Sequence, residues 1–91
     1  MKTIWKYDVP LDVDDFTLDV PEGSEILCLK TQNNIPHLWF LIDVANINKL
    51  ETRTFYIQET EYSFQDYNKM KYVGTFMMRQ DRLVWHLFEY I

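Results

Sequence analysis

The sequence is poor in the residues that mark several common classes of protein. Its one cysteine, Cys28, has no partner for an intramolecular disulfide, whereas a small secreted domain normally carries several cysteines. Its two glycines form no glycine-rich motif, which disfavours a loop that cradles phosphate groups. The start of the chain has no apolar segment of signal-peptide length, and the longest apolar run, residues 38–42, is too short to cross a bilayer. We therefore expect a protein of a reducing cytoplasm, without membrane contact.

Positive charge is also scarce. Nine Lys and Arg residues face fourteen Asp and Glu residues, and the resulting net charge of −5 disfavours binding to duplex DNA or RNA. The excess is concentrated in residues 1–25, which hold seven acidic residues and two lysines, whereas residues 26–91 are neutral. Asp12, Asp14 and Asp15 are the densest part of this acidic segment. They form either a solvated face that keeps the protein soluble or a contact patch for a basic partner.

Apolar residues are abundant, and their spacing is that of strands. Hydrophobic residues make up 47% of the 91 residues, enough for the dense core that one small domain, 1–91, requires. Apolar and polar residues alternate with a period of two, which predicts strands at 3–9, 16–20, 25–31, 37–43, 52–58, 71–78 and 82–90. The segment 37–43 is apolar on both faces and is expected at the centre of a sheet.

The remaining segments predict turns and one irregular stretch. Residues 33–34 and 79–81 are expected to be tight turns, and 46–51 has room for at most one helical turn. Gly74, inside a strand, indicates a bulge or a close backbone approach. The stretch 62–69 is ambiguous. The predicted fold is an all-β, compact antiparallel β-sandwich or small partly open barrel of about six to seven strands.

No catalytic or metal-binding motif is present. The run from Asp12 to Asp15 lacks the glycine and the final glutamate of a calcium loop. Two histidines and one cysteine on separate predicted strands make a poor zinc site. His86, between Trp85 and Leu87, is expected to be a hydrogen-bonded, half-buried histidine, with a general base or ligand-facing group as the alternative. We predict that the protein is not an enzyme and uses no cofactor or metal.

Aromatic and basic residues give two further candidate surfaces. Tyr62, Phe64 and Tyr67, with Tyr56 and Tyr72 beside them, would either cover an open end of the sandwich or form a contact surface for a protein or a second copy. Four basic residues are expected to gather around the last hairpin, where they would meet the phosphates of a nucleotide: Lys69, Lys71, Arg79 and Arg82.

Several blocks of sequence resemble a family of small proteins of unknown function encoded by phages and prophages. They are M-K-T-I-W-K-Y-D-V at 1–9, F-T-L-D-V-P-E-G-S-E-I-L at 16–27, L-W-F-L-I-D at 38–43, Y-V-G-T-F at 72–76 and L-V-W-H-L-F-E at 83–89. The blocks run in order along nearly the whole chain. The resemblance implies a phage gene product acting in a bacterial cytoplasm, and it implies no catalytic residues.

Two functions follow as expectations. The first is a non-enzymatic interaction protein that binds a host or phage protein, for instance as an inhibitor of host defence. The second is a module that binds or sequesters a small molecule such as a nucleotide signal, at a dimer interface. The number of aromatic residues and the sheet edges expected in so small a domain also favour a homodimer.

Overall fold

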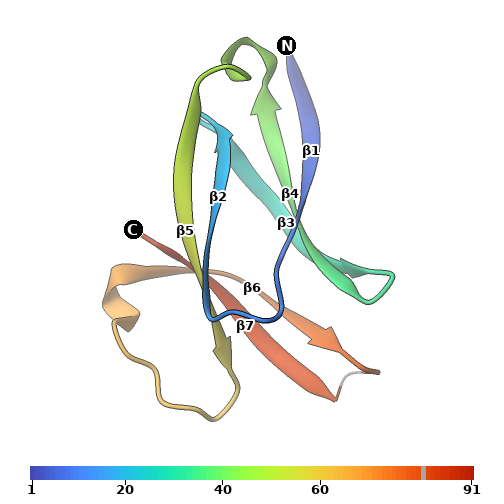
Figure 1. The fold of residues 1–91 in the computed structure, drawn as a ribbon, viewed down its shortest axis with the longest axis vertical. Coiled ribbons are helices and arrows are strands. Elements are labelled where there is room, and N and C mark those ends of the chain that lie inside the picture. Colours follow the sequence, from blue (N-terminus) through green and yellow to red (C-terminus); the bar gives the residue numbers. More distant parts are fainter. Residues whose placement is uncertain (81) are drawn as a thin grey trace.

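The computed structural model describes residues 1–80 and 82–91 and places seven strands in two antiparallel sheets (Figure 1). The strands are β1 (Lys2–Asp8), β2 (Asp15–Pro21), β3 (Glu25–Gln32), β4 (Ile35–Asp43), β5 (Leu50–Glu59), β6 (Met70–Met78) and β7 (Leu83–Tyr90). Two single turns of 3₁₀ helix, η1 (Val44–Asn46) and η2 (Tyr67–Lys69), complete the described secondary structure. The predicted all-β antiparallel fold is therefore confirmed.

The smaller sheet has the order β1-β4-β3. Its centre is β4, as the two-sided apolar pattern predicted, and Leu38, Phe40 and Ile42 of β4 are fully buried. Across the ladder, Trp5 of β1 pairs with Phe40 and Tyr7 pairs with Leu38, so both aromatic side chains share the inner face. The Tyr7 ring packs edge-on against Phe40, with ring centroids 5.2 Å apart. Alternation along these strands thus directs one set of side chains into the core.

The larger sheet has the order β2-β5-β7-β6 and supplies the other wall of the core. Phe55 of β5 and Leu87 of β7 are fully buried, and Phe16 of β2 stacks on Phe55 with centroids 5.3 Å apart. At the far side of the sheet, Phe76 packs edge-on against Trp85 at 5.8 Å. Most of the buried apolar residues of both sheets form one cluster, and Met70 and Phe88 lie outside it.

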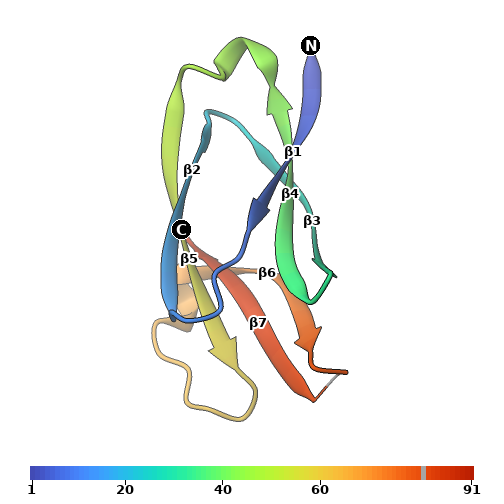
Figure 2. The ribbon, with the colours of Figure 1, turned by 45° about the vertical axis from the view of Figure 1, so that its right-hand side comes forward.

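The two sheets approach each other at one side and separate at the other. Edge strands β3 and β6 face each other, and the Leu29 side chain lies 3.2 Å from the point where a Cβ on Gly74 would stand. Both strands carry a register shift there, between Ile26 and Cys28 and between Tyr72 and Gly74. On the opposite side, β1 and β2 diverge from their connecting loop (Figure 2). Among residues 1–80 and 82–91, no ladder joins the sheets, so the sandwich is open.

An ion pair within the larger sheet lies at the end of the core, and its arginine also contacts the smaller sheet. Arg53 has the inward-facing parity of Phe55 on β5, and its Nε and Nη2 donate to the two carboxylate oxygens of Glu89 at 2.5 and 2.8 Å. Its Nη1 donates to the carbonyl of Ser24 at 2.6 Å, and the guanidinium lies 5.4 Å from the ring centroid of Phe40 in the other sheet. The hydrogen bond to Glu89 raises the pKa of Arg53, against the opposing effect of burial.

Some local predictions differ from the structure. The helical turn expected within 46–51 begins earlier, at Val44, because the Asp43 carboxylate accepts a hydrogen bond from the Ala45 N–H (3.0 Å) and caps the turn. The second 3₁₀ turn falls in the stretch 62–69 that the sequence left ambiguous. Cys28 is half-buried and lies on the outer face of the smaller sheet, opposite Trp39.

Three other predictions concern the last turn, the bulge at Gly74 and the absence of a membrane-spanning segment. The tight turn predicted at 79–81 includes Asp81, which lies outside the described residues, while Arg79 and Gln80 both have positive φ. The bulge predicted at Gly74 is confirmed. In the part of the chain that the structure describes, no helix has the length and apolar character needed to span a bilayer.

Candidate functional site

The outer face of the larger sheet carries an aromatic cluster. Phe64, from the loop after β5, packs edge-on against Phe88 of β7 with centroids 4.7 Å apart, and Tyr67 packs edge-on against Phe64 at 5.4 Å. Tyr72 and Tyr56 complete the cluster at 5.5 Å from Phe88 and 6.0 Å from Phe64, respectively. The sequence offered these aromatics as a cover for an open end or as a contact surface. They cover the outer face of a sheet and not an open end, because the 60–69 loop folds back over β7.

The loop is held in place by a buried side chain that the sequence analysis did not single out. Gln58 is 5% exposed, and its Nε2 donates to the carbonyls of Glu59, Tyr62 and Ser63 at 3.1, 2.9 and 3.3 Å. Positive φ at Glu61 bends the chain between them. This anchoring leaves the ring of Tyr62 in solvent, with 69% of the residue exposed.

The acidic N-terminal segment lies next to these aromatics. Asp15 begins β2 and pairs with Tyr56 of β5, and its carboxylate accepts a hydrogen bond from the Tyr90 hydroxyl (3.2 Å). The carbonyl of Asp14, not its carboxylate, accepts the Ile57 N–H at 2.8 Å. Asp12 lies in the same connection and is exposed, but it does not line the two clefts beside Tyr56.

Two shallow clefts of about 320 Å³ each join the acidic and aromatic groups. One lies between Asp14, Glu59 and Tyr62, and the other between Asp66 and Tyr90, with Tyr56 lining both. We call this region the acidic aromatic surface, and it comprises Asp14, Asp15, Tyr56, Glu59, Tyr62, Asp66, Tyr67 and Tyr90. The acidic segment and the aromatic residues, which the sequence indicated as separate candidate surfaces, therefore contribute to one surface.

The pKa values of two tyrosines on this surface reflect its negative potential. Burial raises the pKa of Tyr56 above its usual value, and the charges of Asp14, Asp15 and Glu59 raise it further. Burial likewise raises the pKa of Tyr90, followed by the charge of Asp15, the hydrogen bond to it and the charge of Asp66. Several carboxylates thus oppose the formation of a tyrosinate here. Lys69 lies beside them, with its Nζ 3.9 Å from Asp66 Oδ1.

The four basic candidates do not form the single cluster that the sequence suggested. Lys69 and Lys71 lie at the start of β6, whereas Arg79 and Arg82 lie beyond its other end. The nine-residue strand separates the two pairs by roughly 25 Å, because a strand rises about 3.3 Å per residue. Lys71 instead lines a polar cleft with Ser24 and Arg53 at the seam between β3 and β6.

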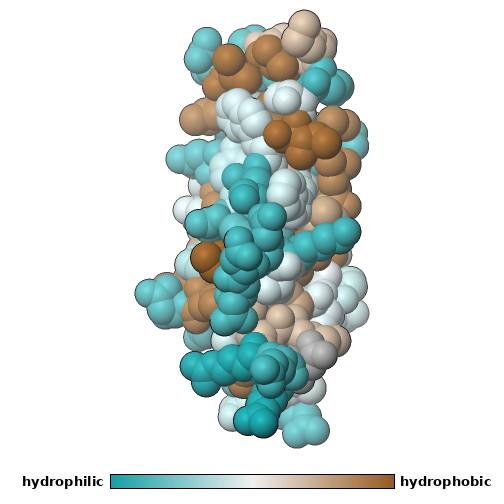
Figure 3. Space-filling view, turned by 90° about the vertical axis from the view of Figure 1, so that its right-hand side faces the viewer, coloured by the Kyte–Doolittle hydropathy of each residue, from teal (hydrophilic) through white to brown (hydrophobic). Residues whose placement is uncertain are grey.

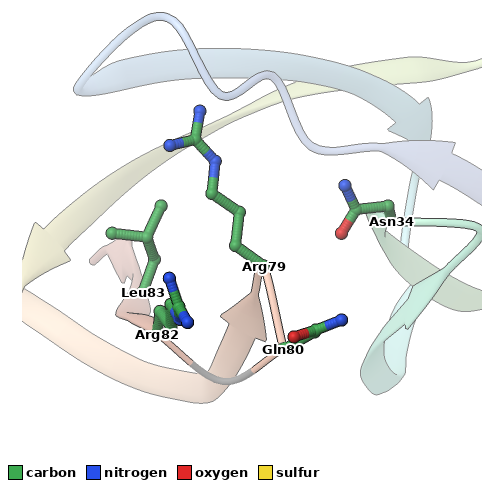
Figure 4. Close-up of a pocket in the computed structure, with 5 residues that line it drawn as sticks. All are labelled: Asn34, Arg79, Gln80, Arg82 and Leu83. Atoms are coloured by element: carbon green, nitrogen blue, oxygen red, sulfur yellow. The ribbon is translucent and has the colours of Figure 1, made fainter.

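Arg79 and Arg82 line a separate cleft of about 690 Å³ between the turns of two hairpins (Figure 4). Asn34, from the β3–β4 turn, lies across from Arg79, and Gln80 and Leu83 complete the described lining. Arg79 extends away from its own turn into this space. The cleft offers two guanidinium groups and two amides, but no aromatic ring among its described lining residues.

His86 is a hydrogen-bonded, half-buried histidine, as predicted. The Thr60 hydroxyl donates to the Val84 carbonyl (2.9 Å), so it accepts the N–H of His86 Nε2 at 2.8 Å. On the other side of the ring, Nδ1 lies within hydrogen-bond distance of the Thr75 hydroxyl (2.9 Å), which also hydrogen-bonds to the Tyr72 hydroxyl (2.6 Å). Both ring nitrogens are therefore occupied. Across the described residues, no three His, Cys, Asp or Glu side chains are grouped so that they could hold a metal ion.

Together these features define an open two-sheet β-domain with an acidic aromatic surface on its larger sheet. A family model described as a domain of unknown function (DUF7352) matches residues 1–91, and the chain belongs to that family. Searches of curated proteins and of solved structures found no match.

Proposed function

We propose that the protein is a non-enzymatic interaction domain that binds a basic protein surface through its acidic aromatic surface. The observation that carries this proposal is the convergence of two features on one face. Asp14 of the acidic segment before β2 and Tyr62 of the loop after β5 are 48 residues apart in the sequence, yet they line the same cleft.

The composition of this surface suits a partner rich in lysine and arginine. Tyr62 and Tyr67 are 69% and 65% exposed, and tyrosine is among the residues that contribute most to binding energy at interfaces. An exposed ring beside carboxylates attracts a cation through the ring quadrupole as well as through charge. The carboxylates would also accelerate encounter with a basic partner, an effect that falls as ionic strength rises.

The resemblance to phage proteins suggests where such a partner would be found. We propose that the domain acts in a bacterial host cytoplasm and that its partner is a host protein, or another phage protein, with a basic face. A small domain that occupies a basic face blocks whatever else binds there. An inhibitor of a host defence protein would work in this way.

Two variants and one matched control test the proposal. Asp14→Lys reverses the charge in the cleft and leaves the backbone bond to Ile57 available, and Tyr62→Ser removes an exposed ring but keeps the carbonyl that Gln58 binds. Asp12→Lys makes the same charge change outside the clefts. Immobilised wild-type protein and each variant are exposed to host lysate at low and high salt, and the captured proteins are quantified by mass spectrometry.

We expect a salt-sensitive partner that Asp12→Lys still captures, and that Asp14→Lys and Tyr62→Ser each bind roughly tenfold more weakly. The proposal fails if the captured set is the same for all four proteins. It also fails if Asp12→Lys reduces capture as much as Asp14→Lys does, because the effect would then belong to net charge alone.

A second candidate function rests on the cleft between the hairpin turns. Two arginines and two amides are groups that bind phosphate oxygens, so this cleft favours a small phosphate-bearing ligand such as a nucleotide signal. Thermal-shift measurements with mono- and cyclic nucleotides and with pyrophosphate test it. We expect stabilisation that Arg82→Gln abolishes and Lys69→Gln preserves. If millimolar ligand leaves the melting temperature of the wild-type protein unchanged, this candidate is eliminated.

A further inference from the structure

The outer edge of strand β1 is regular along the whole strand. The strand pairs with β4 without interruption from Lys2 to Asp8, and among the described residues no strand pairs with its other side. Edge strands β3 and β6 each contain a register shift, and β2 places Asp15 and Asp19 on its outer face. Bulges and charges of one sign are common protections against pairing with another chain. β1 has no register shift, and its outward charges are of both signs, with Asp8 accompanying Lys2 and Lys6.

The hydrogen bonds at its two ends show which peptide groups of β1 are unpaired. The Val44 N–H donates to the Met1 carbonyl (3.0 Å), and the Val9 N–H donates to the Pro36 carbonyl (2.9 Å). Odd-numbered residues of β1 therefore bond to β4, because hydrogen-bonded pairs alternate along an antiparallel ladder. The peptide groups of four even-numbered residues point to the open side: Lys2, Ile4, Lys6 and Asp8.

We propose that two copies of the protein pair antiparallel through β1, with Trp5 of each copy opposite Trp5 of the other. In this register, Lys2 lies opposite Asp8 of the second copy, and Ile4 lies opposite Lys6. All four of these pairs are hydrogen-bonded positions, giving about eight backbone bonds. The result is a continuous six-stranded sheet across the two-fold axis.

The charges and the faces of the side chains favour this register over the registers shifted by one or two residues. A shift of one residue would place inner-face side chains on the outer face. A shift of two residues one way puts Lys2 opposite Lys6 twice, and a shift of two the other way puts Lys6 opposite Lys6 and brings Pro10 into the ladder. Like charges directly opposite each other destabilise a strand pair. The proposed register is the one in which every charge on β1 has an opposite or an apolar neighbour.

The apolar residues along this edge agree with the proposal. Ile4 is 57% exposed and Trp5 38% exposed, and apolar side chains gather over the end of the molecule that holds the N-terminus (Figure 3). The central Trp5 pair is a non-hydrogen-bonded position, where side chains across a ladder lie closest. Lys6 places its Nζ 5.4 Å from the ring centroid of Trp39 and bonds to Gln32 (3.2 Å), so its charged end is held over β4 and β3 and away from Ile4 of the second copy.

The proposed dimer does not use the acidic aromatic surface, which lies on the other sheet. Each copy would keep that surface exposed, so the dimer would present it twice. A single strand edge buries less than the roughly 1,600 Å² of a standard interface, so we expect dissociation in the micromolar range.

A charge exchange tests the register directly. Lys2→Asp alone places two aspartates opposite each other at both ends of the pair, and Asp8→Lys alone places two lysines there. When the two variants are mixed, each aspartate meets a lysine at both ends. Circular dichroism and thermal melting establish first that each variant is folded, because Asp8 also contacts His37, with Oδ1 2.9 Å from Nδ1. Sedimentation velocity over a micromolar concentration series then measures association.

We expect the wild-type protein to dimerise, each variant alone to associate about fivefold to tenfold more weakly, and the mixture to regain wild-type association. A wild-type protein that remains monomeric at high micromolar concentration would overturn the proposal. A mixture that associates no better than either variant alone would overturn the register.

A cysteine at the two-fold axis supplies an independent readout. In a Cys28→Ser background, Trp5→Cys places two thiols at a pair position whose Cα separation of about 4.5 Å suits a disulfide. Thr3→Cys is the matched control, because Thr3 lies opposite Tyr7 and not opposite itself. We expect a covalent dimer from the first variant and none from the second under mild oxidation, and equal yields from the two would contradict the proposed centre.

Discussion

Separating Arg53 from Glu89 should cost more stability than removing both. The side chains of Arg53 and Glu89 are 18% and 12% exposed and share two hydrogen bonds, so a single substitution leaves the other charge buried without its partner. Breaking such a pair typically costs about 3–5 kcal/mol. Because both side chains keep some contact with water, we expect Arg53→Met to lower the free energy of unfolding by about 3 kcal/mol.

The double variant Arg53→Met/Glu89→Leu separates the ion pair from the packing around it. It removes both charges and keeps apolar volume over Phe40, so its stability should lie within about 1 kcal/mol of wild type. It also lacks the hydrogen bond from Arg53 to the Ser24 carbonyl, and this loss limits any increase in the free energy of unfolding. Glu89→Leu alone should cost less than Arg53→Met, because Arg53 keeps its bond to Ser24.

Urea unfolding followed by tryptophan fluorescence measures all four proteins. The four free energies give the coupling between the two side chains, which we expect to be favourable by at least about 2 kcal/mol. If the double variant loses the sum of the two single losses, the coupling is zero. The proposed stabilising interaction between Arg53 and Glu89 would then be refuted.

Three further perturbations test the packing and the surface. Gly74→Val should cost about 2 kcal/mol in urea unfolding, because a Cβ at Gly74 would lie only 3.2 Å from the Leu29 side chain. An unchanged midpoint for Gly74→Val would contradict the close approach. Phe64→Ala should cost about 2 kcal/mol and speed hydrogen exchange in residues 60–66, and unchanged exchange would mean that Gln58 alone holds the loop. The pKa of Tyr90 is raised in the folded protein. The stability that the protonated hydroxyl contributes is therefore fully present below pH about 10, and it declines as the pH rises through the pKa of the folded state. Tyr90→Phe should therefore lose less stability than wild type on alkaline titration, and parallel losses would exclude this coupling.

The strands and their faces could be predicted because they depend on neighbouring residues. Alternation placed Trp5 and Tyr7 on one face of β1, and the two-sided apolar run placed β4 at the centre of its sheet. The inward parity of Arg53 and Glu89 was equally visible in the sequence. A charged residue in register with Phe55 or Leu87 is a signal for a buried pair, and it could have identified Arg53 and Glu89.

The candidate site was predictable only in pieces. The sequence offered Asp14 and Tyr62 as members of two separate surfaces, and it did not single out Gln58 or Tyr90. Their meeting depends on β2 pairing with β5 and on a loop that folds back over β7. The basic residues show the opposite outcome, since Lys71 and Arg79 are near in sequence but an extended strand holds them apart.

The sequence by itself determined the period-two pattern, the turn positions and the side of each strand that faces the core, because these follow from local sterics and from the preference of apolar side chains to leave water. Only the tertiary structure decided which strands pair, which edges are protected and which charged and aromatic groups share a surface. Those outcomes depend on contacts between residues far apart in the chain, whose free energy is gained only after long loops have closed. The acidic aromatic surface and the unpaired edge of β1 are both consequences of that pairing.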